Sequence, residues 1–249
     1  MSQQVLRLSW REVVGAQQLA ARIDAAFAAG TTRVELLVPE TCAELRRAAH
    51  QVGMRREGRL RRAVATDQGT VAGLLYAVLD DDQRAGPEVF STVMNSVLPR
   101  TRLISHTLIT DRAWTDSAAR LLLLEVSYKR DWELPGGVVE PNESPRQGAA
   151  REVREELGVE AQLGRLLVLD WLPPYLGWDD AVELIFDGGV LDPATELRLA
   201  PGEVVAAHWV TVDQAADRLS PLAARRIRWL SAHRGAAPVY CEAGSPVGS

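Results

Sequence analysis

The sequence predicts an α/β protein built from two domains. Segments with the pattern of strands alternate along the chain with segments whose apolar residues recur at helical spacing. In the C-terminal half, strands lie on both sides of an interposed helix, which is typical of a layered α/β sandwich. A polar run that ends in Gly86 and Pro87 separates the halves, so we place the domain boundary between residues 1–86 and 87–235.

The first domain is predicted to be a small α/β unit. Leu19, Ile23 and Phe27 recur at helical spacing. Gly30 suits the end of that helix, which we place at residues 15–30. The other elements predicted here are strands at 5–10, 32–38, 55–65 and 71–79 and a helix at 41–52.

The second domain is predicted to surround one central helix with strands. Five segments have strand patterns: 102–110, 119–128, 165–172, 181–190 and 203–210. Further helices are expected at 87–98, 212–219 and 221–233. The last residues, 236–249, are rich in small residues and Pro and are expected to form a disordered tail.

The chain is organised around residues 136–159, which predict a capped helix. Ser144 suits the N-cap, and Gln147 completes a capping box. Pro145 then occupies the first helical position, and Gly158 suits the left-handed residue that closes the helix. One face carries the apolar residues Ala149, Ala150, Val153 and Leu157.

The adjoining face of this helix is acidic. It carries Glu152, Glu155 and Glu156, at relative spacings of three and four. Like charges at these spacings repel each other by about a few tenths of a kcal/mol per pair on an exposed helix. A divalent cation such as Mg²⁺, which prefers oxygen ligands, would neutralise the row. The alternative is a solvated acidic face that Arg151 and Arg154 partly neutralise.

The same stretch carries a spaced motif. Gly137 is followed after five residues by Glu143, and after seven more by the run R-E-V-R-E-E-L-G-V that begins at Arg151. The run W-E-L-P-G-G at 132–137 precedes it. On these motifs, residues 100–232 resemble the Nudix hydrolase family. The resemblance implies an α/β/α sandwich and hydrolysis, with Mg²⁺ or Mn²⁺, of a pyrophosphate bond in a nucleoside diphosphate linked to another group.

The resemblance also assigns roles to residues. Those that would hold the metal or activate water are Glu152, Glu155 and Glu156. The Gly136 carbonyl would join the coordination, and Glu143 and Arg151 would brace the loop and helix. The general base stays open among Glu152, Glu203, Asp179 and Asp180, and the last three are otherwise ordinary surface carboxylates.

Substrate contacts are expected beyond the helix. An aromatic-rich segment could stack a nucleobase, although core packing explains such aromatics equally well. The resemblance suggests ADP-ribose-like, nucleotide-sugar or dinucleoside polyphosphate substrates, because Pro and Tyr, which mark different groups, are both present. The expected substrate-binding residues are Trp171, Tyr175, Trp178, Asp179 and Glu203.

The first domain resembles a different family. Residues 53–62, the turn at 67–69 and the run 74–79 make residues 15–82 similar to the C-terminal half of a GNAT-type acetyltransferase. That family cradles coenzyme A on a loop of the form Q/R-x-x-G-x-G/A, which is missing here. We therefore expect no acetyl transfer and interpret the segment as an appendage that supports folding, dimerisation or substrate access.

Charge and composition limit the partners. The net charge is −5, divided into +2 over residues 1–86 and −7 over the remainder, which argues against binding a nucleic-acid backbone. The chain has no long apolar run, no signal pattern at its N-terminus and only two cysteines, so we expect a cytoplasmic protein without a membrane span. The expected partner is a small nucleoside diphosphate derivative, and a homodimer is left open. The alternative function is a nucleotide-sensing or interaction module with little turnover.

Overall fold

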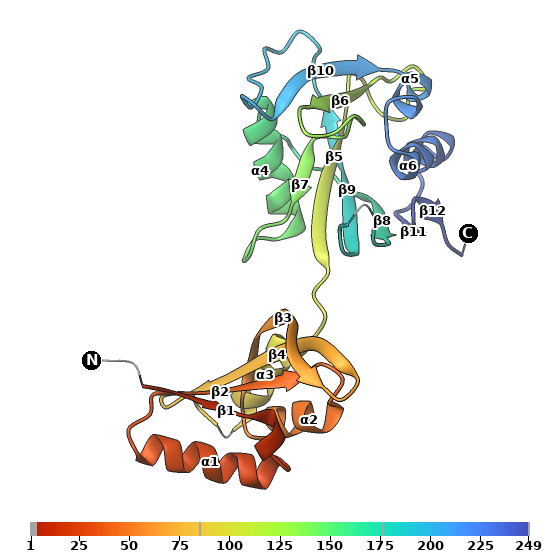
Figure 1. Ribbon diagram of the computed structural model, residues 1–249. Coiled ribbons are helices and arrows are strands. Elements are labelled where there is room, and N and C mark those ends of the chain that lie inside the picture. The colour runs from red at the N-terminus through yellow and green to blue at the C-terminus, as the bar shows by residue number, and fades with distance from the viewer. Residues whose placement is uncertain (1–3, 85, 176, 249) are drawn as a thin grey trace. The chain divides into compact units, whose positions relative to one another are not determined.

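The computed structural model describes the chain in three stretches, residues 4–84, 86–175 and 177–248. It forms two compact units, Met1–Pro99 and Arg100–Ser249 (Figure 1). Ala85, in the predicted boundary run, and Leu176, in the predicted aromatic segment, lie outside the described residues. Within the three stretches, no helix has the length and apolar character needed to cross a membrane.

The division between the units comes after α3 (Pro87–Val97), which corrects the predicted boundary at residue 86. α3 is held to the first unit by Arg56, whose backbone N–H donates to Ser96 Oγ at 2.9 Å. The Arg56 guanidinium also donates to the Ser96 carbonyl, at 3.1 Å. Pro87 lies in the first turn of α3, so the Gly-Pro pair marks the start of a helix and not the end of a domain.

The first unit is a four-stranded sheet in the order β1-β2-β4-β3. β1 pairs with β2 in parallel, and the other pairs are antiparallel. The predicted first strand ends early, because the chain turns into a short 3₁₀ helix at Trp10. The elements are β1 (Val5–Leu8), η1 (Trp10–Glu12), α1 (Ala16–Ala28), β2 (Arg33–Pro39), α2 (Ala43–Gln51), β3 (Arg55–Thr66), β4 (Gly69–Leu79) and α3.

The second unit is built on a mixed sheet in the order β10-β6-β5-β9-β8-β11-β12, with β7 paired to β5. β5 and β9 run parallel, as do β8 and β11. The strands are β5 (Arg102–Thr110), β6 (Leu121–Val126), β7 (Gly136–Val138), β8 (Leu166–Leu172), β9 (Ala181–Val190), β10 (Val204–Val210), β11 (Val239–Glu242) and β12 (Ser245–Pro246). The helices are α4 (Pro145–Leu157), α5 (Val212–Ala216) and α6 (Pro221–Ala232).

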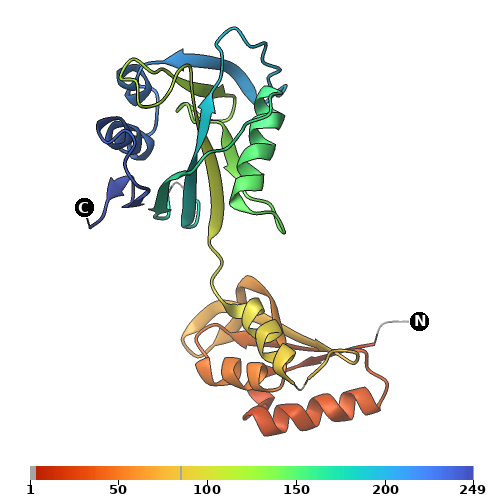
Figure 2. The ribbon, with the colours of Figure 1, turned by 180° about the vertical axis from the view of Figure 1, so that it is seen from behind.

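Helices cover both faces of this sheet. Successive residues of β6 point to opposite faces. Leu123 packs in a cluster with Ile227 of α6, whereas Leu122 packs in a second cluster with Val153 of α4. Figures 1 and 2 show α4 on one side of the sheet and α5 and α6 on the other. The predicted α/β/α sandwich is confirmed.

The predicted disordered tail is corrected by the structure. β11 extends the sheet beyond β8, and β12 pairs with β11 in an antiparallel turn. Cys241 of β11 is only 1% exposed and belongs to the core cluster that α6 covers. A strand of four residues offers too few alternations to stand out from its Ala-, Gly- and Pro-rich surroundings, so composition alone was misleading.

Candidate active site

The central helix, α4, begins and ends where its local sequence predicts. Ser144 Oγ accepts a hydrogen bond from the Gln147 backbone N–H at 3.3 Å, and Gln147 Oε1 accepts one from the Ser144 N–H at 2.8 Å. Gly158 adopts φ 69° and donates its N–H to the Arg154 carbonyl at 3.0 Å. The capping box and the left-handed end are therefore confirmed, and they set which side chains face the sheet.

Two glycines bring the chain before α4 directly against the sheet and the helix. Gly136 and Gly137 lie in β7, a strand that the sequence analysis missed, and pair with His106 and Ser105 of β5. A Cβ at Gly136, where φ is 140°, would lie 2.2 Å from the Ser105 carbonyl. A Cβ at Gly137 would lie 2.7 Å from Glu152 Oε1, so the Glu152 carboxylate occupies the space that a side chain would need.

Glu156 is a buried carboxylate beside this loop. It is 2% exposed, and its Oε2 accepts a hydrogen bond from the Gly136 N–H at 2.8 Å. Burial raises the pKa of Glu156 to about 8, against the opposing effect of the Gly136 hydrogen bond. The neighbouring charges that add to this rise are Glu152, Glu133 and Glu203.

Burial also raises the pKa of Glu152, and the charges of Glu155 and Glu203 act in the same direction. The Arg151 guanidinium opposes the rise. We call Glu133, Glu152, Glu156 and Glu203 the carboxylate cluster. Of the predicted substrate-binding and base candidates outside α4, Glu203 is the one that the structure brings to this cluster.

Sequence reasoning missed Glu133 and its partners. Glu133 accepts a hydrogen bond from the Tyr128 hydroxyl at 2.6 Å and forms an ion pair with Lys129. Burial and the adjacent Glu133 raise the pKa of Tyr128. Its sequence signal is its place inside the run W-E-L-P-G-G, directly before the motif.

Arg151 gathers the charged side chains of the motif. Its Nη2 donates to Glu143 Oε1 at 2.8 Å and to the Val138 carbonyl at 3.1 Å. Its Nη1 donates to Glu152 Oε1 at 2.9 Å and to Glu155 Oε2 at 3.0 Å. The hydrogen bond from Arg151 lowers the pKa of Glu143. One guanidinium thus joins the loop before α4, the strand β7 and the acidic face of the helix.

The donor set of this region is suited to a hard divalent cation. Every candidate ligand, on α4 and at Gly136, offers oxygen, and Mg²⁺ prefers carboxylate and carbonyl oxygen. Burial is the largest cause of the raised pKa values of Glu152 and Glu156, and neighbouring carboxylates add to both. Among the described residues, no group of three or more His, Cys, Asp or Glu is arranged to hold a metal ion. Glu152 and Glu155 form ion pairs with Arg151.

The predicted aromatic contacts lie in and after β8. Trp171 is 37% exposed, while Tyr175 and Trp178 are each 62% exposed. The backbones of Tyr175 and Trp178 exchange hydrogen bonds of 3.1 and 2.9 Å, which form a tight turn. The Arg102 guanidinium lies 4.5 Å above the Trp178 ring. Two exposed aromatic rings and a cation therefore share one surface at the start of β5.

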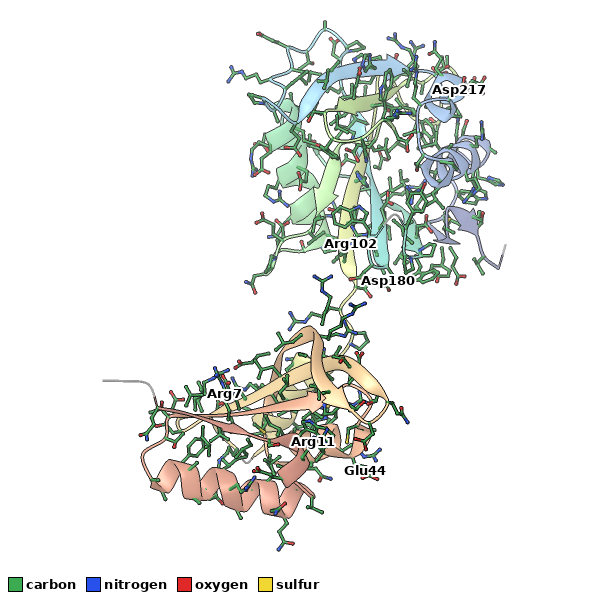
Figure 3. The ribbon with its side chains drawn as sticks, in the orientation of Figure 1. Arg7, Arg11, Glu44, Arg102, Asp180 and Asp217 are labelled. Atoms are coloured by element: carbon green, nitrogen blue, oxygen red, sulfur yellow. The ribbon has the colours of Figure 1, made fainter. Side chains whose placement is uncertain are left out.

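Asp179 and Asp180 lie at this same surface. The Asp179 carbonyl accepts a hydrogen bond from Arg102 at 2.9 Å, and Asp180 Oδ2 accepts one from Thr101 at 3.1 Å. Figure 3 shows Arg102 and Asp180 at the start of β5. Within the described part of the chain, no hydrogen bond or ion pair joins either aspartate to α4. The two aspartates are thus base candidates without a contact to the motif.

Comparison with known proteins identifies the second unit. Residues 110–230 match the model of the NUDIX domain. A MutT-like protein of Streptomyces ambofaciens is 34% identical over 120 residues, which cover 48% of this chain and 71% of that protein. Diphosphoinositol polyphosphate phosphohydrolase 2 of Rattus norvegicus is 55% identical over 47 residues, 19% of this chain and 26% of that protein.

The chain is also similar to the crystal structure of a MutT protein from Methanosarcina mazei Go1, with 25% sequence identity and a TM-score of 0.46. The similarity covers 56% of this chain and 99% of that one. The NUDIX match begins at residue 110, so the resemblance of residues 15–82 to GNAT-type acetyltransferases stays a prediction. The motif on α4, the capped helix that carries it and the MutT-like relative agree on one family. The chain belongs to the Nudix hydrolase family and is a Nudix-type pyrophosphohydrolase.

Proposed function

We propose that the protein hydrolyses a pyrophosphate bond in a nucleoside diphosphate linked to another group, with Mg²⁺ or Mn²⁺ as its cofactor. The observation that carries this proposal is the carboxylate cluster around the Gly136 loop. Burial and mutual repulsion raise the pKa of both Glu152 and Glu156 there. Concentrated negative charge of this kind favours a divalent cation, and a diphosphate group needs such a cation for its own charge.

The residues of α4 and β7 would have two kinds of role, which are holding the cation and orienting its ligands. Glu152, Glu155, Glu156 and the Gly136 carbonyl would hold the cation. When bound, the cation would offset phosphate charge and lower the pKa of a coordinated water. Arg151 orients Glu152 and Glu155 through hydrogen bonds of 2.9 and 3.0 Å. Glu143 holds Arg151 in turn, so it would act on the site only through that guanidinium.

Glu203 is our preferred general base. Its charge raises the pKa of both Glu152 and Glu156, and this electrostatic effect is the observation that ties Glu203 to these two carboxylates. Glu152 is paired with Arg151 at 2.9 Å and is assigned above to the cation instead. Asp180 Oδ2 accepts a hydrogen bond from Thr101, and the backbone carbonyl of Asp179 accepts one from Arg102, so neither contact brings these residues to α4. The base must reach the proton that it removes, and this favours Glu203.

The substrate's nucleoside would bind at the exposed aromatic surface. Tyr175 and Trp178 are each 62% exposed, and Trp171 lies on the strand that leads to them. Aromatic rings bind nucleobases by stacking. The rat relative, 55% identical over 47 residues, is named for a diphosphoinositol substrate, so similarity of this extent does not choose the group that is linked to the diphosphate. That choice would rest on the aromatic surface and on Asp179.

A substrate panel with matched variants tests the proposal. We expect Mg²⁺- or Mn²⁺-dependent turnover of at least one nucleoside diphosphate derivative, and a loss of about a hundredfold or more in kcat for Glu156→Gln and Glu155→Gln. Glu160→Gln is the control, because Glu160 lies beyond the helix and its side chain is 78% exposed. Absence of metal-dependent turnover would refute the enzyme assignment. Tight nucleotide binding without turnover would instead support a sensing module.

A further inference from the structure

A row of buried charges crosses the face of the sheet that α6 covers. Asp170 of β8, Glu183 of β9 and Arg226 of α6 are 0%, 3% and 5% exposed. Arg226 Nη1 donates to Asp170 Oδ2 and to Glu183 Oε2, each at 2.7 Å. The Gly244 N–H, in the turn between β11 and β12, donates to Asp170 at 3.0 Å. Buried ion pairs can often be replaced by apolar residues without loss of stability. The stability of the fold therefore does not by itself explain why these three charged residues are buried here.

The row ends at His106 on β5. The second carboxylate oxygen of Glu183 lies 2.9 Å from His106 Nδ1, and the His106 side chain is only 13% exposed. His106 is directly opposite Gly136 in the pairing of β5 with β7. A Cβ placed on Gly136 would lie 2.6 Å from the His106 Cα and 2.9 Å from its ring atom Cδ2. The imidazole edge therefore lies against the Gly136 backbone.

Gly136 is a residue that needs such support. Its φ of 140° is a conformation that favours glycine, and glycine loses more conformational freedom on folding than any other residue. Its N–H also donates to Glu156 Oε2 of α4, at 2.8 Å, so the Gly136 backbone contacts both the imidazole and the helix. A ring that is fixed by a hydrogen bond at Nδ1 cannot rotate away from its neighbour, which is how carboxylates orient histidines near metal sites.

We propose that His106 is a positioning residue for the backbone at Gly136, where β7 begins. The row Asp170–Arg226–Glu183 fixes the imidazole, and the imidazole fixes the Gly136 backbone so that its N–H meets Glu156 and its carbonyl faces the ligand set. The proposal deepens the proposed function and rests on it where it concerns the cation. It also connects the C-terminal turn to the active site, because Gly244 holds the far end of the row.

If the row Asp170–Arg226–Glu183 served only to stabilise the fold, its loss would change different measurable quantities. Loss of a stabilising buried charge pair lowers the free energy of unfolding without changing the metal-free geometry of a loop elsewhere. Loss of a positioning residue changes the Gly136 backbone and the affinity for the cation, even where the protein remains folded. Two readouts that do not depend on turnover separate these roles: Mn²⁺ binding measured by electron paramagnetic resonance without substrate, and the ¹H–¹⁵N amide signal of Gly136.

The experiment compares four full-length variants with the wild type. His106→Leu removes the hydrogen bond to Glu183, whereas the amide of His106→Gln can still donate to it. Glu183→Gln keeps the size of the side chain and removes its charge. His50→Gln is the control, because His50 is also partly buried and hydrogen-bonded, to Tyr76 at 3.2 Å, but belongs to the first unit.

For His106→Leu we expect Mn²⁺ affinity to fall by about tenfold or more, the magnitude that is usual when a residue behind a metal ligand is lost. We also expect kcat to fall with little change in KM, and the Gly136 amide signal to move more than that of Gly158 at the far end of α4. His106→Gln should restore most of the affinity, and His50→Gln should change none of these quantities.

Unchanged Mn²⁺ affinity and an unmoved Gly136 signal in folded His106→Leu would overturn the proposal. If that variant does not fold, the same two results in Glu183→Gln would overturn it. Failure of the proposed function can be told apart from failure of the His106 proposal. If the wild type neither binds Mn²⁺ nor hydrolyses any diphosphate, the Gly136 signal still shows whether His106 restrains the loop.

Discussion

Glu156 Oε2 and the Gly136 backbone N–H form a hydrogen bond of 2.8 Å between residues 20 positions apart. The contact joins α4 to β7 and places a carboxylate in surroundings where it is 2% exposed. A buried carboxylate with no cationic partner of its own destabilises the folded protein until a ligand neutralises it. The same contact therefore shapes both the stability of the metal-free protein and the site.

Replacement of Glu156 should stabilise the metal-free protein while it removes activity. The folded pKa of about 8 lies above the ordinary value of 4.5, so ionisation favours unfolding as pH rises from about 4.5 and the effect levels off above about 8. Glu156→Gln should thus raise the free energy of unfolding by roughly 1–3 kcal/mol near pH 7.5 and by little below pH 4.5. Urea denaturation at several pH values checks this, and destabilisation at all of them would contradict it.

Removal of Arg151 should disable the site more than it weakens the fold. Arg151→Gln loses the contacts to Glu143, Glu152 and Glu155 together. We expect kcat/KM to fall by about ten- to a hundredfold, as for other residues that orient metal ligands. Arg154→Gln on the same helix is the control, because its one ion pair, to Glu160, is 4.0 Å long and exposed. Equal activity in both variants would show that the bracing contacts are dispensable.

A methyl group at Gly137 should displace Glu152. The added Cβ would lie 2.7 Å from Glu152 Oε1, closer than real contacts allow, so the carboxylate must move. We expect Gly137→Ala to lower kcat by about tenfold or more and to weaken Mn²⁺ binding. Gly58→Ala, where no atom lies within 4 Å of the new Cβ, serves as the control. Full activity in Gly137→Ala would remove Glu152 from the proposed ligand set.

The C-terminal turn should be part of the folded unit. Gly244 has φ 78°, and a Cβ there would lie 2.4 Å from the Leu222 carbonyl. Gly235 has a similar φ of 81°, but its nearest neighbour would be 4.0 Å away. We expect Gly244→Ala to destabilise by about 2–4 kcal/mol and Gly235→Ala by about 1 kcal/mol, because only the first adds a clash to the backbone strain. A freely moving tail would give a smaller effect at Gly244 than at Gly235 in thermal denaturation.

Much of the site could be predicted because its signals are local. The cap formed by Ser144 and Gln147 spans three residues, and the acidic and apolar faces of α4 follow from helical periodicity. The strand at β7 was missed because three residues, two of them glycine, carry no periodic pattern. Asp179 and Asp180 stay base candidates, and the tertiary structure adds that Asp180 Oδ2 accepts a hydrogen bond from Thr101 and the Asp179 carbonyl accepts one from Arg102.

The sequence by itself determined the family motif, the capped helix and the acidic face of that helix, because each depends on residues a few positions apart. Only the tertiary structure decided that Glu156 is buried against Gly136, that Glu133 and Glu203 join it, and that Glu183 fixes His106. These relationships depend on strand pairing between segments distant in the chain. Burial and charge interactions are properties of that pairing, so no local pattern encodes them.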